Sequence, residues 1–155
     1  MSEVGPSLPG MAYDFQVTVD STDPHTQAEW WAETLGWQVE PQDEDFIRDM
    51  VAKGFATEDE TLVFRGRLVW KTGAAIVHPE KLPSGKPRRM LFNHVPEPKI
   101  VKDRIHVDVW VGDEHRERVR DELVARGATF VQDGRQGPFT WCVMRDPEGN
   151  EFCIS

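Results

Sequence analysis

Arg104-Ile-His-Val-Asp-Val-Trp-Val111 alternates apolar and polar side chains, and an earlier stretch, Tyr13-Asp-Phe-Gln-Val-Thr-Val-Asp20, alternates in the same way. Alternation with a period of two residues is typical of a strand with one buried face. Asp23 follows the earlier stretch and Asp113 follows the later one, each placed as the N-cap of a helix. The sequence therefore contains a strand–helix unit that occurs twice.

The two units can be overlaid residue by residue. Gln16 then falls on His106, and Thr18 falls on Asp108. The later parts match as well, because Ile76-Val-His-Pro79 falls on Met144-Arg-Asp-Pro147 and a closing strand follows each. An internal repeat decides the fold before any other motif does. We therefore expect an α+β fold in which two βαβββ modules form a curved mixed β-sheet around a shared cavity.

The repeat also sets the domain layout. A segment without a counterpart carries Phe46, Ile47 and Met50 at helical spacing, which predicts a short helix that covers a sheet edge or acts as a lid over the cavity. Two prolines favour an extended connector between the modules. We expect a flexible lead at 1–11 and a single domain at 12–155, with module one at 12–95, its insertion at 41–60, the linker at 96–103 and module two at 104–155.

Composition narrows the possible partners. Among 155 residues, 27 are acidic and 18 basic, giving a net charge of −9, whereas nucleic-acid binders normally present a basic surface. No apolar run approaches the roughly 20 residues that span a bilayer. With Cys142 and Cys153 as the two cysteines, no secreted disulfide framework is indicated. We expect a cytoplasmic protein with neither nucleic acid nor membrane as partner.

Each lead strand should present two different faces. The apolar face is expected to pack under the helix, and it carries Phe15, Val17, Val19, Ile105, Val107 and Val109. The opposite face is polar with one aromatic side chain, and it carries Gln16, Thr18, Arg104, His106, Asp108 and Trp110. This second face is either an ordinary solvated surface or a pocket wall, and two halves that curl together favour the pocket.

Three further stretches resemble one family. The stretch from Arg104 to Val109, the turn Asp146-Pro-Glu-Gly-Asn150 and the stretch from Leu91 to Glu97 are similar to the glyoxalase-like branch of the vicinal-oxygen-chelate superfamily. That superfamily includes glyoxalases, extradiol dioxygenases and bleomycin-resistance-like binding proteins. The resemblance covers about Ala12 to Ser155 and implies the doubled module and a homodimer.

The resemblance also implies where a metal would lie. Metal enzymes of the superfamily carry one ligand on each lead strand and one on each closing strand, positions that here hold Gln16, Asn93, His106 and Cys153. These positions provide no carboxylate for a hard cation. His106 and Cys153 could attract Zn²⁺, and Asp108 could lend a carboxylate, but zinc sites normally use at least three strong ligands. We expect no metal and no other cofactor.

Several single residues are candidates for chemistry. His106 is either a general base oriented by Asp108 or a histidine that hydrogen-bonds a ligand. Cys153 is a nucleophile or, more commonly for a strand thiol, a small apolar side chain. Trp110 is the best candidate to stack on an organic ligand, together with ligand-binding positions Gln16, Thr18, Asn93 and Cys153.

The remaining aromatic and histidine side chains are interpreted structurally. Trp30, Trp31 and Trp37 are expected in the core or at a dimer contact, and surface positions are expected for His25, His78, His94 and His115.

Three functions of the protein stay open. The first is metal-free binding of a small organic molecule in the inter-module cavity. The second is a glyoxalase-like lyase or isomerase with His106 as base, acting on a small oxygenated metabolite. The third is an interaction module.

Overall fold

The computed structural model describes residues 12–155, so the lead expected at 1–11 lies outside the described residues. The first half contains β1 (Val17–Ser21), α1 (Pro24–Leu35), β2 (Gln38–Val39), α2 (Glu44–Ala52), a short 3₁₀ turn (Glu58–Glu60), β3 (Thr61–Phe64), β4 (Arg67–Trp70), β5 (Gly73–Val77) and β6 (Arg89–His94). The second half contains β7 (Asp108–Val109), α3 (Arg116–Ala125), β8 (Thr129–Gln136), β9 (Phe139–Arg145) and β10 (Glu151–Ile154). No helix within 12–155 has the length and apolar character needed to cross a membrane.

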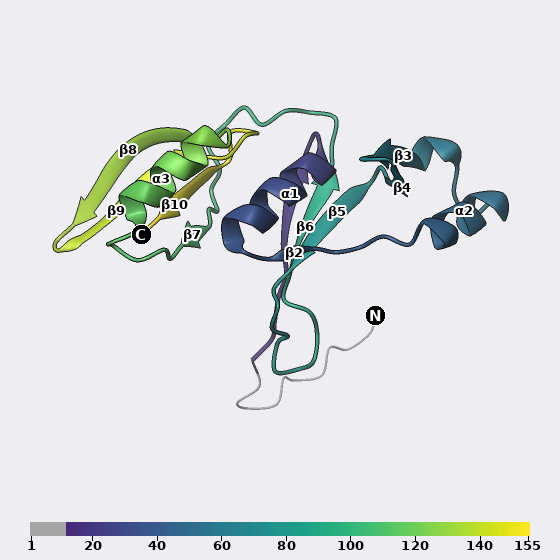
Figure 1. The fold of residues 1–155 in the computed structure, drawn as a ribbon, viewed down its shortest axis with the longest axis horizontal. Coiled ribbons are helices and arrows are strands. Elements are labelled where there is room, and N and C mark those ends of the chain that lie inside the picture. The colour runs from purple at the N-terminus through teal and green to yellow at the C-terminus, as the bar shows by residue number, and fades with distance from the viewer. Residues whose placement is uncertain (1–11) are drawn as a thin grey trace, which may run out of the picture.

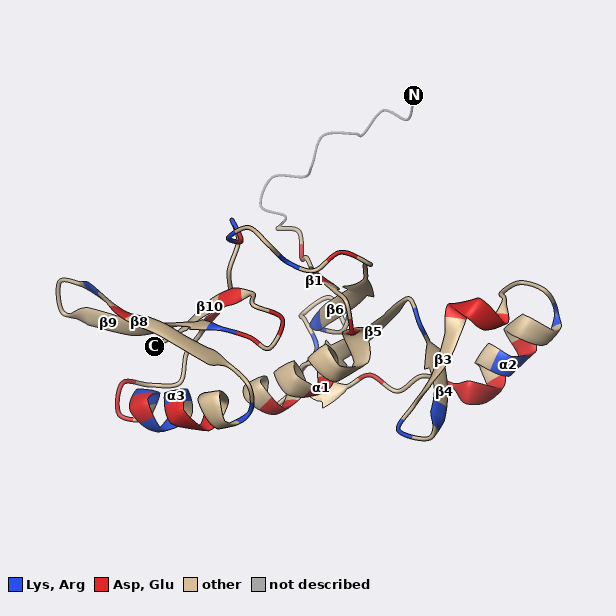
Figure 2. Ribbon diagram, turned by 90° about the horizontal axis from the view of Figure 1, so that it is seen from above, with Lys and Arg blue, Asp and Glu red and all other residues tan. Residues whose placement is uncertain are grey.

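The two halves repeat one sheet topology. The strands pair in the order β1-β6-β5-β2 in the first half and β7-β10-β9-β8 in the second. β1 pairs with β6 in parallel and β7 pairs with β10 in parallel, and the other pairs in each sheet are antiparallel. The halves lie side by side, with α1 and α3 on the same side of the molecule (Figures 1 and 2). The expected α+β fold with two related modules and curved mixed sheets is confirmed.

The caps of the two main helices differ. Asp23 caps α1 as expected, since its side chain accepts a hydrogen bond from the Thr26 backbone N–H, and Gly36 ends the helix with a φ of 68°. The expected N-cap at Asp113 is wrong, because a turn intervenes and α3 begins at Arg116. The Asp113 carboxylate instead lies 3.2 Å from the Arg116 guanidinium.

The lead strands are shorter than the alternating pattern predicts. Val17, Val19, Val107 and Val109 pack against the core as expected. Phe15 and Ile105 were expected to pack there too, and this is wrong: they are 84% and 88% exposed. Both residues precede the points at which β6 and β10 provide a pairing partner. Without a neighbouring strand and a helix above it, an apolar side chain stays in solvent.

Aromatic side chains of α1 join the two halves. The rings of Trp30 and Trp31 contact the ring of Phe152 on β10, with centroids 5.9 and 5.0 Å apart. The Trp30 indole N–H donates to the Arg126 carbonyl at 2.9 Å, and the Arg126 guanidinium donates to the Trp30 carbonyl at 2.8 Å. Edge-on aromatic packing of this kind adds to the stabilisation from area burial. The interpretation of Trp30 and Trp31 as core residues is confirmed.

A buried carboxylate fastens the same junction. Asp146 is 3% exposed. One of its oxygens accepts hydrogen bonds from the side chains of Gln27 and Trp31, both on α1. Its other oxygen accepts from the backbone N–H groups of Glu148 and Asn150, at 3.0 Å each. The turn Asp146–Asn150 therefore does two things: it connects β9 to β10 and it holds the second half on α1.

The segment between β2 and β5 forms a small unit of its own. β3 and β4 make a separate two-stranded sheet, and α2 packs on β4 with Ile47 fully buried. The Gln42 side chain donates to the Gly73 carbonyl and accepts from the Trp70 N–H, at 2.9 and 2.7 Å. This unit lies at the end of the first half that is remote from the second (Figure 1). In this position α2 is a surface helix and does not cover the space between the halves.

Candidate functional site

Two open clefts lie along the second half. The first has a volume of about 900 Å³ and separates β1 from the linker and β10, so both halves line it. The second has about 810 Å³ and lies on the face of the second sheet that is opposite α3. His106 and Glu151 line both clefts. Both volumes fall within the range of small-molecule pockets.

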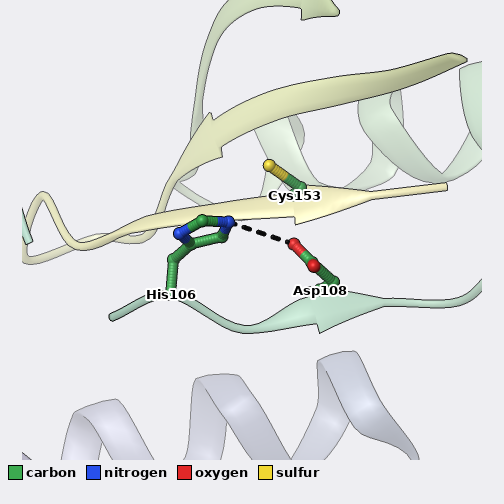
Figure 3. A group of neighbouring side chains, drawn as sticks. All are labelled: His106, Asp108 and Cys153. Atoms are coloured by element: carbon green, nitrogen blue, oxygen red, sulfur yellow. Dashed lines mark ion pairs between the residues drawn. The ribbon is translucent and has the colours of Figure 1, made fainter. Parts of the chain in front are cut away.

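Three side chains that could bind a ligand or a metal meet in the second cleft. Parallel pairing of β7 with β10 sets Asp108 directly beside Cys153, and His106 precedes Asp108 by two residues on the same face. The Nε2 atom of His106 lies 3.3 Å from a carboxylate oxygen of Asp108. One donor atom from each of the three side chains lies within 4.8 Å of the others, and Figure 3 shows the His106 ring directed at the Asp108 carboxylate, with Cys153 on the neighbouring strand.

The environment of Cys153 opposes its use as a nucleophile. Burial raises the pKa of the Cys153 thiol, and the Asp108 carboxylate raises it further through its charge and a hydrogen bond. A higher pKa means less thiolate, which is the reactive form. Cys142 cannot pair with it: β9 and β10 place Cys142 opposite Ile154 and Cys153 opposite Val143, so the two thiols point to opposite faces. Both thiols are free.

Aromatic side chains line the second cleft beside this cluster. Trp110 follows β7 and is 88% exposed, and Trp141 and Phe139 of β9 lie on the same cleft. Gly134 of β8 faces Trp141 so closely that a Cβ at this position would lie 2.2 Å from the indole ring. An exposed indole next to ionisable groups can stack on an aromatic ligand while the polar groups orient it.

A half-buried ion pair fixes the linker at the edge of the site. The Glu151 carboxylate accepts from the Lys99 ammonium and from the Asp103 backbone N–H, at 3.0 Å each. Burial raises the pKa of Glu151, but these hydrogen bonds, one from its own backbone N–H and the charge of Lys99 together more than reverse the effect and lower the pKa to about 2. Glu151 therefore stays ionised and ties the linker to β10. Glu151 comes directly after the Asp146–Asn150 turn, and this position was the sequence signal that could have identified it as a residue at the edge of the site.

The other predicted site residues are dispersed. Gln16 and Thr18 line the first cleft with His106, and Gln16 also accepts a long hydrogen bond, 3.5 Å, from Arg89. Arg104 lines the first cleft too. Asn93 is exposed on β6 and lines neither cleft. The four overlaid positions therefore do not converge within one chain, whereas His106, Asp108 and Cys153 do.

One of the four histidines expected on the surface is buried. His25 is 6% exposed, stacks on Phe64 with centroids 5.2 Å apart, and is hydrogen-bonded through Nε2 to the Trp70 carbonyl at 2.8 Å. The surface prediction for His25 is wrong because the β3–β4 hairpin covers the start of α1. His25 is thus a packing residue of the first half and takes no part in either cleft.

The residues at the metal positions do not suit a hard divalent cation. Mg²⁺, Mn²⁺ and Ca²⁺ require several oxygen ligands, and the cluster offers one carboxylate. The closing-strand positions hold Asn93 and Cys153, and neither residue supplies a second carboxylate. The donor set of imidazole, carboxylate and thiol is of the kind that borderline and soft cations prefer.

Comparison with known proteins places this geometry in a family. The model of the glyoxalase-like domain matches residues 16–155. A search of curated proteins finds no match. Solved structures with the same fold include a hypothetical protein of S. aureus, with a TM-score of 0.57, 11% identity, and coverage of 94% of this chain and 97% of that one.

Two further structures are of a fosfomycin resistance protein and a bleomycin-binding protein. The fosfomycin resistance protein FosX of Listeria monocytogenes has a TM-score of 0.57 and 8% identity, and covers 93% of this chain and 92% of its own. The bleomycin-binding protein of Streptomyces verticillus, complexed with copper(II)-bleomycin, has a TM-score of 0.50 and 14% identity, with coverage of 94% and 98%. At these identities the structures show the fold alone, and the family-model match carries the assignment. The chain therefore belongs to the glyoxalase-like domain family.

Proposed function

We propose that this protein binds a small organic molecule in the second cleft and does so without the hard divalent ion of metal-dependent relatives. The observation that carries the proposal is Trp110, an indole 88% exposed beside the His106–Asp108 pair in an open cleft of about 810 Å³. An exposed indole in a cleft of this size, beside ionisable side chains, offers an apolar surface on which an aromatic ligand can stack. A planar ligand would cover it and could receive hydrogen bonds from the neighbouring polar groups.

The comparisons support a binding role of this kind. One structural neighbour is a bleomycin-binding protein complexed with copper(II)-bleomycin, and another is a fosfomycin resistance protein. Acidic residues are prominent in the second cleft, where Asp108, Asp113 and Glu151 face a single lysine, Lys102. Since Lys99 already neutralises Glu151, the local charge favours a neutral or cationic ligand over an anionic one.

A second copy of the chain completes the site in this proposal. Apolar side chains around the two clefts stand in solvent, namely Phe15, Ile100, Val101, Ile105 and Phe139, each at least 73% exposed. A grouping of exposed apolar side chains typically marks an interaction surface. A homodimer would bury them and bring the open face of one first half, with Asn93, toward the cleft of a second half. Light scattering during gel filtration should then give twice the monomer mass of 17.7 kDa, and a monomer at micromolar concentration would count against it.

The binding proposal is tested with a library of planar aromatic natural products. Thermal shift identifies stabilising compounds, and tryptophan fluorescence gives their dissociation constants. Trp110→Ala should weaken binding of these compounds by roughly tenfold or more, the range expected for an aromatic anchor. Phe55→Ala is the matched control, because Phe55 is also largely exposed, at 78%, but lies beyond α2. Equal affinities in Trp110→Ala and wild type would contradict the proposal.

A catalytic role is the second candidate, and the His106–Asp108 distance of 3.3 Å favours it. A carboxylate in contact with an imidazole can fix its orientation and support proton abstraction from a carbon next to a carbonyl. His106→Ala should then abolish turnover of a small oxygenated substrate, and Asp108→Asn should reduce it. Full turnover in His106→Ala would remove the histidine from the mechanism.

Two free cysteines fit a reducing compartment, and we propose that the protein is cytoplasmic.

A further inference from the structure

β8 is the outermost strand of the second sheet, and its outer edge is open. The strand order β7-β10-β9-β8 gives β8 a single neighbour, and Figure 1 shows β8 at the outer rim of the second half. The strand has 8 residues, whereas a typical strand has about five or six. An open strand edge presents backbone N–H and C=O groups on which a further strand can add.

The register of the β8–β9 hairpin shows which backbone groups of β8 point outward. The two-residue turn Gly137-Pro138 makes Gln136 and Phe139 a hydrogen-bonded pair, and such pairs alternate with non-hydrogen-bonded pairs along the ladder. Asp133 and Arg135 occupy the alternate positions, so their N–H and C=O groups point away from β9. Within residues 12–155 these backbone groups have no hydrogen-bond partner outside the ladder.

The charges on this edge are arranged symmetrically. A bulge interrupts the ladder before Gln132, and the regular part that follows is Gln132-Asp-Gly-Arg-Gln136, with opposite charges on the two sides of its glycine. Asp133 and Arg135 are exposed, and neither forms an ion pair within the described part of the chain. The Asp133 carboxylate accepts a hydrogen bond from the Cys142 thiol, and the Arg135 guanidinium donates to a carbonyl of the hairpin turn. A strand that carries the same charges in reverse order would complement this edge.

We propose that β8 pairs with β8 of a second copy of this chain, antiparallel and about a two-fold axis at Gly134. Such an interface is self-complementary, as two-fold contacts are. Asp133 then lies opposite Arg135 of the second copy at a hydrogen-bonded position, and symmetry repeats this pair. The outward backbone groups and both charges are satisfied in the same register.

Other registers oppose like charges. A shift by two residues keeps the outward backbone groups paired, but it sets Asp133 opposite Asp133 of the second copy or Arg135 opposite Arg135. Parallel pairing in register has the same fault at both positions. Like charges directly opposite each other destabilise a pair of strands. The sequence of β8 therefore selects the register centred on Gly134.

This contact joins two four-stranded sheets into a continuous one and leaves the clefts accessible. Gln132 of one copy faces Gln136 of the other on the cleft side, so the second clefts of both copies open on the same side of the joined sheet. The contact uses the backbone and charges of β8. It is separate from the cleft-side homodimer, goes beyond ligand binding and does not depend on it.

Cysteine cross-linking tests the register. Gln132 and Gln136 lie about 13 Å apart along one strand, too far for a disulfide within a chain. In the proposed pair they face each other at a non-hydrogen-bonded position, where Cα atoms about 4.5 Å apart suit a disulfide. Under mild oxidation at submillimolar concentration, chains with Gln132→Cys should therefore cross-link with chains that carry Gln136→Cys.

Each cysteine variant alone is the matched control. Its new thiol faces a glutamine of the second copy, so cross-linking should be about tenfold slower or more, because the effective concentration of thiols is lower. Peptide mass spectrometry distinguishes the link between positions 132 and 136 from links through Cys142 or Cys153. Equally fast cross-linking of either variant with itself would overturn the proposed register.

Charge reversal tests the same pairing without new thiols. Five paired residues bury little area, and interfaces below about 1,200 Å² are typically weak, so we expect wild-type association to increase between micromolar and submillimolar concentration. Asp133→Arg and Arg135→Asp should each abolish this increase in sedimentation equilibrium. An equimolar mixture of the two variants should restore it, because each copy supplies the charge that the other lacks.

The double variant Asp133→Arg/Arg135→Asp keeps the net charge of −9 and should associate like wild type. Circular dichroism establishes that each variant is folded. No increase in mass for wild type, or a mixture that fails to associate, would overturn the proposal. The mass at micromolar concentration reports on the cleft-side homodimer and no ligand is present, so failure here leaves those proposals standing.

Discussion

Replacing Asp146 with alanine should destabilise the protein strongly even though Asp146 lies outside both proposed chemistries. The side chains of Gln27 and Trp31 are 2% and 4% exposed and donate hydrogen bonds to one Asp146 oxygen. A buried donor left without a partner costs roughly 1–3 kcal/mol, so leaving both of these donors unpaired should lower the free energy of unfolding by about 2–6 kcal/mol. The middle of that range, about 4 kcal/mol, is a large fraction of the roughly 5–15 kcal/mol that stabilises a typical domain.

Urea unfolding followed by tryptophan fluorescence measures this loss, because Trp30 and Trp31 lie at the junction. The midpoint concentration and slope give the free energy of unfolding for each variant. Asp146→Asn retains one oxygen acceptor and should fall between wild type and Asp146→Ala. Asp121→Ala is the control, since Asp121 is 71% exposed in an ion pair with Arg120 and should change stability by less than about 0.5 kcal/mol. A loss below about 1 kcal/mol in Asp146→Ala would refute the role assigned to this carboxylate.

Further outcomes follow from other contacts. The pKa of Glu151 is lowered to about 2 from an ordinary 4.5, so its stabilising effect is complete above pH 4.5 and is lost as the pH falls toward 2. Glu151→Gln should therefore be less stable than wild type at pH 7, with the gap closing near pH 2 in urea unfolding; a gap independent of pH would contradict this. Gly134→Ala should displace the Trp141 indole and cost about 1–3 kcal/mol, with a changed near-ultraviolet dichroism spectrum; an unchanged spectrum would argue against the close contact. Trp110→Ala should leave the free energy of unfolding within about 0.5 kcal/mol of wild type, because the ring is solvent-exposed; a larger loss in urea unfolding would contradict this.

The repeated strand–helix pattern was sufficient to predict two related modules. Period-two alternation identifies which side chains share a face, and the overlay of Gln16 on His106 led us to expect two modules in one curved mixed sheet; the structure has the two modules, each with its own four-stranded sheet, and the two sheets have corresponding strand orders. The ends of the strands were not predictable in this way. Phe15 and Ile105 continue the alternation, but a strand ends where its neighbour does, and the starts of β6 and β10 depend on distant parts of the chain.

Contacts between the halves were also beyond the sequence pattern. The sequence Asp146–Asn150 predicts a turn from its backbone preferences. Nothing in the local sequence indicates that the Asp146 carboxylate accepts hydrogen bonds from Gln27 and Trp31 on α1. The burial of His25 depends in the same way on a hairpin about forty residues later, within a segment that has no counterpart in the second half. Period and propensity describe neighbours along the chain, whereas these contacts depend on tertiary packing.

The site was predicted in part. His106 and Asp108 were singled out on one strand face, and the structure places them 3.3 Å apart. The parallel register that brings Cys153 beside Asp108 completes the cluster, and a register cannot be read from alternation alone. Their roles in ligand binding or catalysis remain predictions that the experiments above decide.

The central claim is that the face carrying Trp110 and the His106–Asp108–Cys153 cluster is the binding surface. Indole N–H signals in a proton–nitrogen correlation spectrum test it most directly, because the chain has six tryptophans and Trp110→Ala identifies the signal of Trp110. Addition of a stabilising aromatic compound should shift the signals of Trp110 and Trp141, while those of the buried Trp30 and Trp31 stay in place. Shifts that leave Trp110 and Trp141 unchanged and affect other tryptophans would contradict the claim.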